Sequence, residues 1–200
     1  MIVKNLNAKD LVINELELSA RLSSPILSDA VSDELYGEAV SAIKPSYAAI
    51  RVKLLRENGG IRIGKSHSRS KALLKLFEGC SECFVFAATL GVGADRLVLK
   101  KGYKSVGDAF VIDALFDALI EAVCDAAEAD LTDGVCASGR VRPGYGDIEL
   151  SLGAQILALC DAERTLGIKL TESGLMVPKK SVSAIIAIKD NKNEEDNRKN

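Results

Sequence analysis

The sequence predicts an α+β fold in which a mostly antiparallel sheet is flanked by helices. Residues 47–54 and 181–188 are rich in apolar and β-branched side chains over strand-like lengths, and residues 47–54 alternate apolar with polar positions. Residues 107–131 and part of 147–167 instead carry apolar side chains at helical spacing. The two kinds of segment do not alternate strictly, which favours α+β over a parallel, doubly wound sheet.

The first 45 residues are expected to form a short extended start followed by helical segments. Ser28 is a candidate N-cap, and apolar residues then recur at steps of four as far as Pro45, which closes the stretch. These apolar positions are Val31, Leu35, Ala39 and Ile43.

A β-hairpin is predicted next. The alternating run 47–54 is followed by Asn58-Gly59 and by a second alternating run at Ile61 and Ile63. Asn-Gly between two alternating runs is the strongest short-range hairpin signal. A helix is expected to follow over residues 68–77.

The rest of the chain is predicted to contain two strands and three helices. In order, we expect a buried strand at 83–89, a turn and short helix at 91–101, a long helix at 107–131, a helix within 147–167 and a strand at 181–188. Gly167 is expected to end the fourth of these at the C′ position. Residues 1–190 are therefore predicted to form one domain, and the wholly polar residues 191–200 a disordered tail.

Composition and charge exclude several classes of protein. Of the 200 residues, 48% are apolar and 27% are charged, as in ordinary globular proteins, and the net charge is -2. That charge predicts no general affinity for nucleic acid or for anionic membranes. The longest apolar run, residues 83–94, is too short to span a bilayer, and the N-terminus has no signal-peptide or lipidation pattern. We therefore expect a cytoplasmic protein.

The five cysteines are expected to be reduced and mostly buried structural thiols, because their number is odd and most lie among apolar or small residues. Cys80 and Cys83 have C-x-x-C spacing, which is typical of half a zinc or iron–sulfur site. The sequence has no second such pair, and the single histidine, His67, is not spaced to complete a four-ligand site. No metal site is predicted.

One alternative function rests on residues Gly59 to Ser66, which satisfy the phosphate-loop pattern G-x-x-x-x-G-K-[ST]. In a nucleotide hydrolase of this type, Lys65 would contact phosphate and Ser66 would contact magnesium. The strand-like alternation of residues 61–63 argues against it, since β-branched residues resist the backbone angles that such a loop often uses. The hairpin turn explains these glycines more simply.

An acidic row is predicted on the long helix. Asp113, Asp117, Glu121 and Asp125 recur at steps of four and therefore share one helix face. Residues 105–139 hold eight acids and no Lys or Arg, whereas residues 51–75 hold eight Lys or Arg and one acid. Either the row faces cations from elsewhere in the chain, such as residues 51–75, or one or two of its carboxylates face a cationic ligand.

The loop that begins at Arg140 is the other candidate site. Pro143 and Gly144 bend the chain, and Gly144 and Gly146 let a ligand approach the backbone closely. We expect Arg140 and Arg142 to point to different sides, so that one binds a carboxylate and the other faces solvent. The composition fits both an anion-binding loop with an aromatic lid at Tyr145 and a plain turn with two surface arginines.

Several blocks of sequence in this region resemble the activation domain of cobalamin-dependent methionine synthase, and more specifically a stand-alone activation subunit. The blocks are Arg140-x-x-x-Gly144-Tyr145, Leu170-Thr-Glu-Ser173, Met176-x-Pro178 and Ser181-Val-Ser183, with Ala88-Thr-Leu-Gly91 and the acidic helix in agreement. The resemblance covers about residues 10–190 and is strongest after 138.

The resemblance implies an α+β domain that binds S-adenosylmethionine beside a corrinoid-binding methionine synthase subunit. In this family an electron from a flavodoxin- or ferredoxin-like donor and a methyl group from S-adenosylmethionine restore cobalamin that has fallen to the cob(II) state. The domain supplies position and electrostatics, since the methyl donor and the cobalt carry the chemistry.

The resemblance also implies site residues. Arg140 would hold the carboxylate of the ligand, with backbone around Arg142, Pro143 and Gly144 assisting. Tyr145 would face the cobalamin. Asp117 and Glu121 match acids in the long helix of the family and would lie near the positive groups of the ligand. The acid that precedes the arginine in the longer, fused form has no counterpart at equal spacing, although Asp133 is near.

Overall fold

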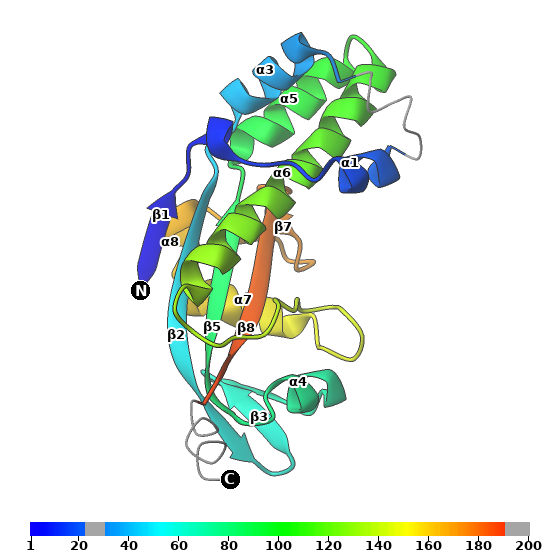
Figure 1. Ribbon diagram of the computed structural model, residues 1–200. Helices are drawn as coiled ribbons and strands as arrows, with labels where there is room; N and C mark the ends of the chain where they lie inside the picture. The colour runs from blue at the N-terminus through cyan, green and yellow to red at the C-terminus, as the bar shows by residue number, and fades with distance from the viewer. Residues whose placement is uncertain (23–30, 191–200) are drawn as a thin grey trace.

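The computed structural model describes residues 1–22 and 31–190, and Figure 1 shows how their helices and strands are arranged. The strands are β1 (Ile2–Asn5), β2 (Ser46–Glu57), β3 (Gly60–Ile63), β4 (Ser66–Ser68), β5 (Cys80–Thr89), β6 (Lys169–Leu170), β7 (Met176–Val177) and β8 (Ser181–Lys189). The helices are η1 (Ala8–Asp10, 3-10), α1 (Glu15–Arg21), α3 (Asp33–Ala42), α4 (Lys71–Leu76), α5 (Val92–Gly102), α6 (Val106–Thr132), α7 (Ser151–Leu159) and α8 (Ala162–Leu166).

Antiparallel pairing organises the main sheet, which confirms the predicted fold class. Its six strands run in the order β4-β3-β2-β5-β8, and β1 also pairs with β2. β1 pairs with the first residues of β2, and β3 with the last, so the long strand β2 carries a neighbour at each end. β6 and β7 form a separate two-stranded sheet. These strands of two residues are too short to show a period and were not predicted.

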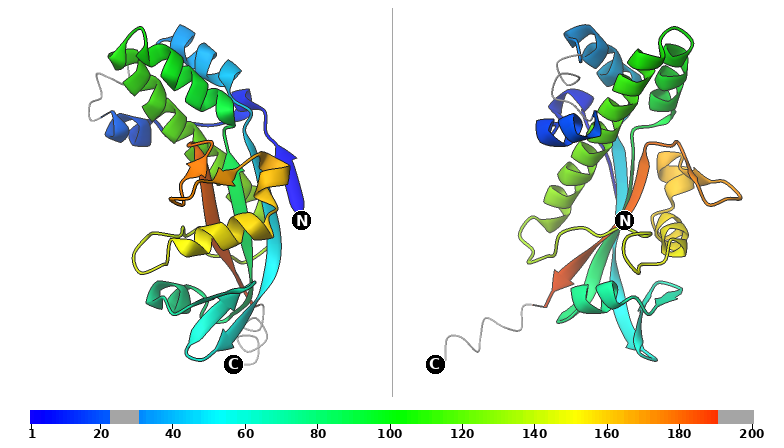
Figure 2. Two further views of the ribbon diagram at one scale, coloured as in Figure 1. Left: turned by 180° about the vertical axis from the view of Figure 1, so that it is seen from behind. Right: turned by 90° about the vertical axis from the view of Figure 1, so that its right-hand side faces the viewer.

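Helices cover both faces of the main sheet (Figure 2). Along β5, Phe84 and Phe86 point into a core shared with α1, α3, α5 and α6, whereas Cys83 and Val85 point into a second core shared with α4, α7 and α8. This alternation is the direct result of the strand geometry, in which successive side chains point to opposite faces. The strand β8 forms the edge of the sheet at which the two faces meet.

The predicted hairpin is confirmed and the phosphate-loop hypothesis is wrong. Asn58 and Gly59 both have positive φ angles, 50° and 69°, and place Leu54 opposite Ile63 in the β2–β3 ladder. Residues 60–63 are therefore a strand. Gly64, with φ 60°, turns the chain into the strand β4, and no helix begins before Lys71. The phosphate pattern is thus spread over two strands and a turn, with no loop that can surround a phosphate.

Several predicted boundaries shift. The helix expected over 68–77 is only α4, because residues 66–68 pair with β3. The helix expected within 147–167 is divided into α7 and α8 at Asp161, which has a left-handed φ of 47°, and Gly167 ends α8 as predicted. Ser32 caps α3 through a 3.2 Å bond from the Leu35 amide. The candidate cap Ser28 and the tail 191–200 lie outside the described residues.

Four of the five cysteines are buried, as expected, but Cys136 is exposed. Cys80 and Cys83 share one core despite their spacing, because the register of β5 against β8 shifts between Cys80 and Glu82. Burial raises the pKa of Cys83 to about 12. The described residues contain no group of three or more His, Cys, Asp or Glu side chains arranged to hold a metal ion.

Among the described residues, no helix combines the length and apolar character that crossing a membrane requires.

Candidate functional site

Residues 137–148, hereafter the site loop, pass around the edge of the sheet at β8. The first part of the loop pairs with β8: Val141 and Ile185 exchange two backbone hydrogen bonds of 2.9 Å, and Ser138 donates to the Ala187 carbonyl at 2.9 Å. The second part is a turn in which Gly144 has a φ of 87° and donates to the Ile148 carbonyl at 2.9 Å. The loop thus leads from the face covered by α6 to the face covered by α7.

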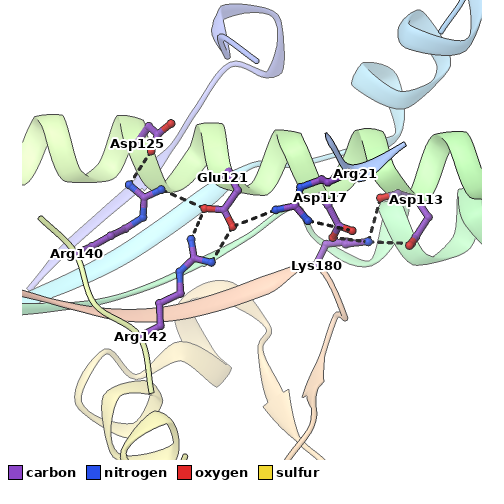
Figure 3. Close-up of polar contacts among 8 residues, drawn as sticks. All are labelled: Arg21, Asp113, Asp117, Glu121, Asp125, Arg140, Arg142 and Lys180. Atoms are coloured by element: carbon purple, nitrogen blue, oxygen red, sulfur yellow. Dashed lines mark hydrogen bonds and ion pairs between the residues drawn. The ribbon is translucent and has the colours of Figure 1, made fainter. Parts of the chain in front are cut away.

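Both arginines of the site loop point at the same carboxylate on α6 (Figure 3). Arg142 donates from Nη1 to Glu121 Oε1 at 2.7 Å and from Nη2 to Glu121 Oε2, while Arg140 Nη2 lies 3.1 Å from Oε2. The expectation that the two arginines point to different sides is wrong. Residues two apart in an extended segment share a side, and Val141 between them is the residue that bridges to β8.

Arg140 contacts two further carboxylates. Its Nη1 lies 2.6 Å from both Asp125 Oδ1 and Glu128 Oε2, and its backbone amide donates to Glu128 Oε1 at 3.2 Å. Glu128 was not predicted, although it lies seven residues after Glu121 and so shares its helix face. Asp133, the acid noted near the arginine in the sequence, is the exposed residue at the end of α6 instead.

The other end of the acidic row is closed by Lys180, the residue directly before β8 (Figure 3). Its Nζ lies 2.9 Å from Asp113 Oδ1, 2.7 Å from Asp117 Oδ1 and 3.1 Å from the Asp113 carbonyl oxygen. Arg21 of α1 lies between the two ends, 3.6 Å from Asp117 and 3.8 Å from Glu121. The row therefore faces cations of this chain, as one interpretation expected. They come from α1, the site loop and the residue before β8 rather than from residues 51–75.

Arg142 and Arg140 keep the carboxylate of Glu121 ionised. Burial by itself raises the pKa of Glu121, but hydrogen bonds and charge from Arg142 and then Arg140 outweigh it and hold the pKa below its ordinary value. For Arg140, burial lowers the pKa, and the bonds to Glu128, Asp125 and Glu121 raise it by more. Glu121 and Arg140 are therefore both charged at neutral pH.

Two pockets adjoin the site loop, one on each side of the sheet edge. The charged pocket, of about 740 Å³, is lined by Arg21, Glu121, Glu128, Arg140 and Arg142, and by Ala72 of α4. The apolar pocket, of about 320 Å³, is lined mainly by Pro143, Leu150, Met176 and Val182. Arg142 and Tyr145 border both pockets.

The predicted site residues therefore do not all line the same pocket. Glu121, Arg140 and Arg142 line the charged pocket, and Pro143 lines the apolar one. Tyr145 is 65% exposed at the rim that the pockets share, next to the turn at Gly144. Asp117 lines neither of these two pockets and is held by Lys180.

Comparison with known proteins finds a family that this region is similar to. Residues 128–194 match the family described as vitamin B12 dependent methionine synthase, activation domain. The matched stretch contains Glu128, the whole site loop and β8. A comparison with curated protein sequences finds no significant match.

A solved structure extends the likeness in fold over most of the chain. The crystal structure of the MetH reactivation domain bound to AdoHcy superposes with a TM-score of 0.70. It is 18% identical in sequence, and the match covers 93% of this chain and 77% of that one. At this identity the likeness establishes the fold. Residues 128–194 are therefore similar in sequence to an activation domain of the vitamin B12 dependent methionine synthase type, and the chain has the fold of the MetH reactivation domain.

Proposed function

We propose that the chain is an accessory subunit that binds S-adenosylmethionine in the charged pocket. It would thereby support reductive methylation of cob(II)alamin on a cobalamin-dependent methionine synthase or a related corrinoid methyltransferase. One observation carries the proposal: the segment that matches the activation-domain family supplies most of the residues that line the charged pocket, Arg140 and Arg142 among them. The solved relative with this fold was crystallised with AdoHcy, the demethylated form of the same ligand.

The charges in the pocket suit the two kinds of group on this ligand. S-adenosylmethionine has a carboxylate at one end and two positive groups, an ammonium and a sulfonium. Arg140 is the residue that we assign to the ligand carboxylate, since a guanidinium binds carboxylates through paired hydrogen bonds. The ligand would take the place of Asp125, which is 61% exposed and therefore the easiest of the three Arg140 partners to move into water.

Glu121 and Glu128 are then the carboxylates nearest to the positive groups of the ligand. Glu121 is only 12% exposed and already ionised, so it attracts a cation without first losing a proton. We assign this role to Glu121 in preference to Asp117, because Lys180 neutralises Asp117 outside the pocket. Arg142 would hold Glu121 in place, and the backbone at Pro143 and Gly144 would shape the adjoining turn.

The described residues suit contact with one exposed face of a corrin ring, but they do not form a complete binding site for cobalamin. The chain has a single histidine, His67, whose Nε2 lies 3.0 Å from the Glu57 carbonyl oxygen in the hairpin, so the site loop offers the cobalt no imidazole ligand. Tyr145 and Leu150, which line the apolar pocket, have exposed side chains that suit contact with a flat macrocycle. The cobalamin would therefore be held by a corrinoid-binding partner and face Tyr145.

The work of this chain would be binding and orientation. When bound, S-adenosylmethionine supplies a methyl group on a positively charged sulfur, and the site loop would hold that group towards the rim at Tyr145. The electron would come from a flavodoxin- or ferredoxin-like donor. The described residues include no free nucleophile or general base at the pocket, since its carboxylates are paired with arginines.

Calorimetry with S-adenosylmethionine tests the proposal. Arg140→Ala is expected to weaken binding by at least about tenfold, because a charge-assisted bidentate contact is lost. Arg164→Ala is the matched control, since Arg164 is an exposed arginine paired with Asp161 on α8, away from both pockets. Absence of binding by the unmodified chain, even with a corrinoid-binding partner present, contradicts the proposal.

A further inference from the structure

A strongly basic surface lies beside the site loop, and the ligand pocket does not account for it. It is formed by the hairpin β2–β3, the strand β4 and the helix α4, and we call it the basic arm. Arg51 and Arg56 are exposed on β2, where Arg51 pairs with Glu82 and Arg56 donates to the Phe77 carbonyl. The other exposed cations of the arm are Lys53, Lys65, Arg69, Lys71 and Lys75. None of these five makes an ion pair with any residue that the structure describes, and the arm's one acid, Glu57, is paired with Arg62 at 2.8 Å.

Hydrogen bonds fix the arm to the site loop. Asp147 accepts from Ser70 Oγ at 2.6 Å and from the amides of Lys71 and Ala72 at 2.6 and 3.2 Å. Two residues further on, Glu149 accepts from Ser68 Oγ at 2.6 Å. Figure 1 shows α4 directly beside this part of the chain. The arm is therefore a rigid continuation of the rim on which Tyr145 is exposed, and Ala72 of the arm lines the charged pocket.

We propose that the basic arm is the docking surface for a carboxylate-rich face of the corrinoid-carrying protein. The inference rests on the proposed function, which requires a second protein to bring its corrin against Tyr145. A protein that covers the rim must also extend over the arm, because β4 and α4 are bonded to residues 147 and 149 of the same turn. Unpaired surface cations at the border of such an interface steer an acidic partner and set its orientation.

The surroundings of the arm favour an acidic protein over a nucleic acid. Residues 53–76 contain no Phe, Tyr or Trp on which a base would stack. On the α6 side of the charged pocket, Asp125 of the acidic row is 61% exposed. A continuous phosphate backbone that left the arm in that direction would meet like charge, whereas a protein with a bounded acidic patch meets only the arm.

A charge-reversal experiment tests the inference. The partner probe is the corrinoid-binding domain of a methionine synthase loaded with cob(II)alamin, and its affinity for the full chain is measured at several salt concentrations. The arm variant is Lys65→Glu/Arg69→Glu. The matched control, Lys100→Glu/Lys104→Glu, makes the same change of charge at exposed positions at the end of α5. S-adenosylmethionine affinity is measured in parallel for all three proteins.

The unmodified chain is expected to bind the probe with an affinity that falls steeply as salt rises, because exposed charges are screened. The arm variant is expected to bind about tenfold more weakly at low salt and to depend less on salt, while the control stays within about twofold. All three proteins are expected to bind S-adenosylmethionine equally, because none of the four substituted residues lines the charged pocket.

Three outcomes would overturn the docking surface. The first is equal binding of the probe by the arm variant and the control. The second is no binding of the probe by the unmodified chain at any salt. The third is arm-dependent binding of a single-stranded oligonucleotide with no arm dependence for the corrinoid domain. Failure of the proposed function would be seen separately, because the unmodified chain would then not bind S-adenosylmethionine.

Discussion

The two ends of the acidic row on α6 are built from the same kinds of group but differ in access. At one end, Asp113 and Asp117 both contact Lys180, whose side chain is 10% exposed and lines neither pocket beside the site loop. At the other end, Glu121 and its neighbours contact Arg140 and Arg142, and these side chains form the wall of the charged pocket. The first end is closed by the chain itself, while the second can exchange its partners for a ligand.

This difference separates two roles that the sequence pattern does not distinguish. A lysine bonded to two side-chain carboxylates and a carbonyl ties β8 to α6, so the role of the Lys180 end is to hold the edge strand in place. An arginine that contacts several carboxylates can lose one of them and keep contacts of similar strength with the others. Replacing one carboxylate by a zwitterionic ligand should therefore cost less free energy at the arginine end than at the Lys180 end. We therefore expect stability to depend mostly on the Lys180 end and ligand binding mostly on the arginine end.

The largest effect on stability is expected from Lys180→Met. This change keeps the length of the side chain but leaves Asp113 and Asp117 without their shared cation. The free energy of unfolding should fall by about 2 kcal/mol, which is less than for a fully buried pair because both carboxylates are partly hydrated.

Urea denaturation measures this change, and calorimetry with S-adenosylmethionine supplies the contrast. Ligand affinity should stay within about threefold of that of the unmodified chain, since the arginine end is intact. A loss of affinity as large as that of Arg140→Ala would mean that the two ends form one functional unit.

The second effect is a pH dependence at the arginine end. The pKa of Glu121 is held below its ordinary value of 4.5 in the folded chain, so the unfolded chain binds the proton more readily. The stabilisation by Glu121 is therefore fully present above pH 4.5 and is lost as the pH falls through the lower, folded pKa. Glu121→Gln should reduce stability by about 1–2 kcal/mol at pH 7.

The difference in stability between the unmodified chain and Glu121→Gln should shrink steadily as the pH is lowered. Urea denaturation at pH 7, 5, 4 and 3 measures this difference. Comparing the two proteins removes the contribution of the other carboxylates, which both contain. A difference that is constant over this range would show that Glu121 acts through packing rather than through its charge.

Much of the fold follows from local patterns, and the pairing at the site does not. The hairpin at Asn58-Gly59 and the long helix α6 are encoded by turn chemistry and by periodicity within a few residues. The break at Asp161 was missed because an aspartate in the left-handed region leaves no such pattern. The strand β4 was missed because three residues are too few to show a period.

At the site, the sequence singled out Arg140, Arg142 and Glu121 as candidate binding residues, but it did not predict that they contact one another. Their pairing depends on the path of the site loop around β8. The Lys180–Asp117 contact likewise joins residues 63 positions apart. Only the packing of β8 against α6 brings such residues together, and no spacing rule applies to it.

The smallest expected effect concerns the wall of the charged pocket rather than its charges. Asp147 holds the first turn of α4 through three hydrogen bonds, which lower the pKa of its carboxyl, and so it positions Ala72 at the pocket. Asp147→Asn keeps the shape but weakens the bonds to the two amides, because the charge on the acceptor is lost. Hydrogen exchange at the Lys71 and Ala72 amides should accelerate, and the melting temperature should fall by less than in Glu121→Gln.

S-adenosylmethionine affinity should fall only slightly in Asp147→Asn, because the arginine end keeps all its charged groups. Asp133→Asn, an equal change of charge at an exposed position at the end of α6, should alter none of these quantities. A loss of S-adenosylmethionine affinity in Asp147→Asn as large as that in Arg140→Ala would contradict this prediction. It would mean that ligand binding depends more on the bonds between the basic arm and the site loop than on the arginines.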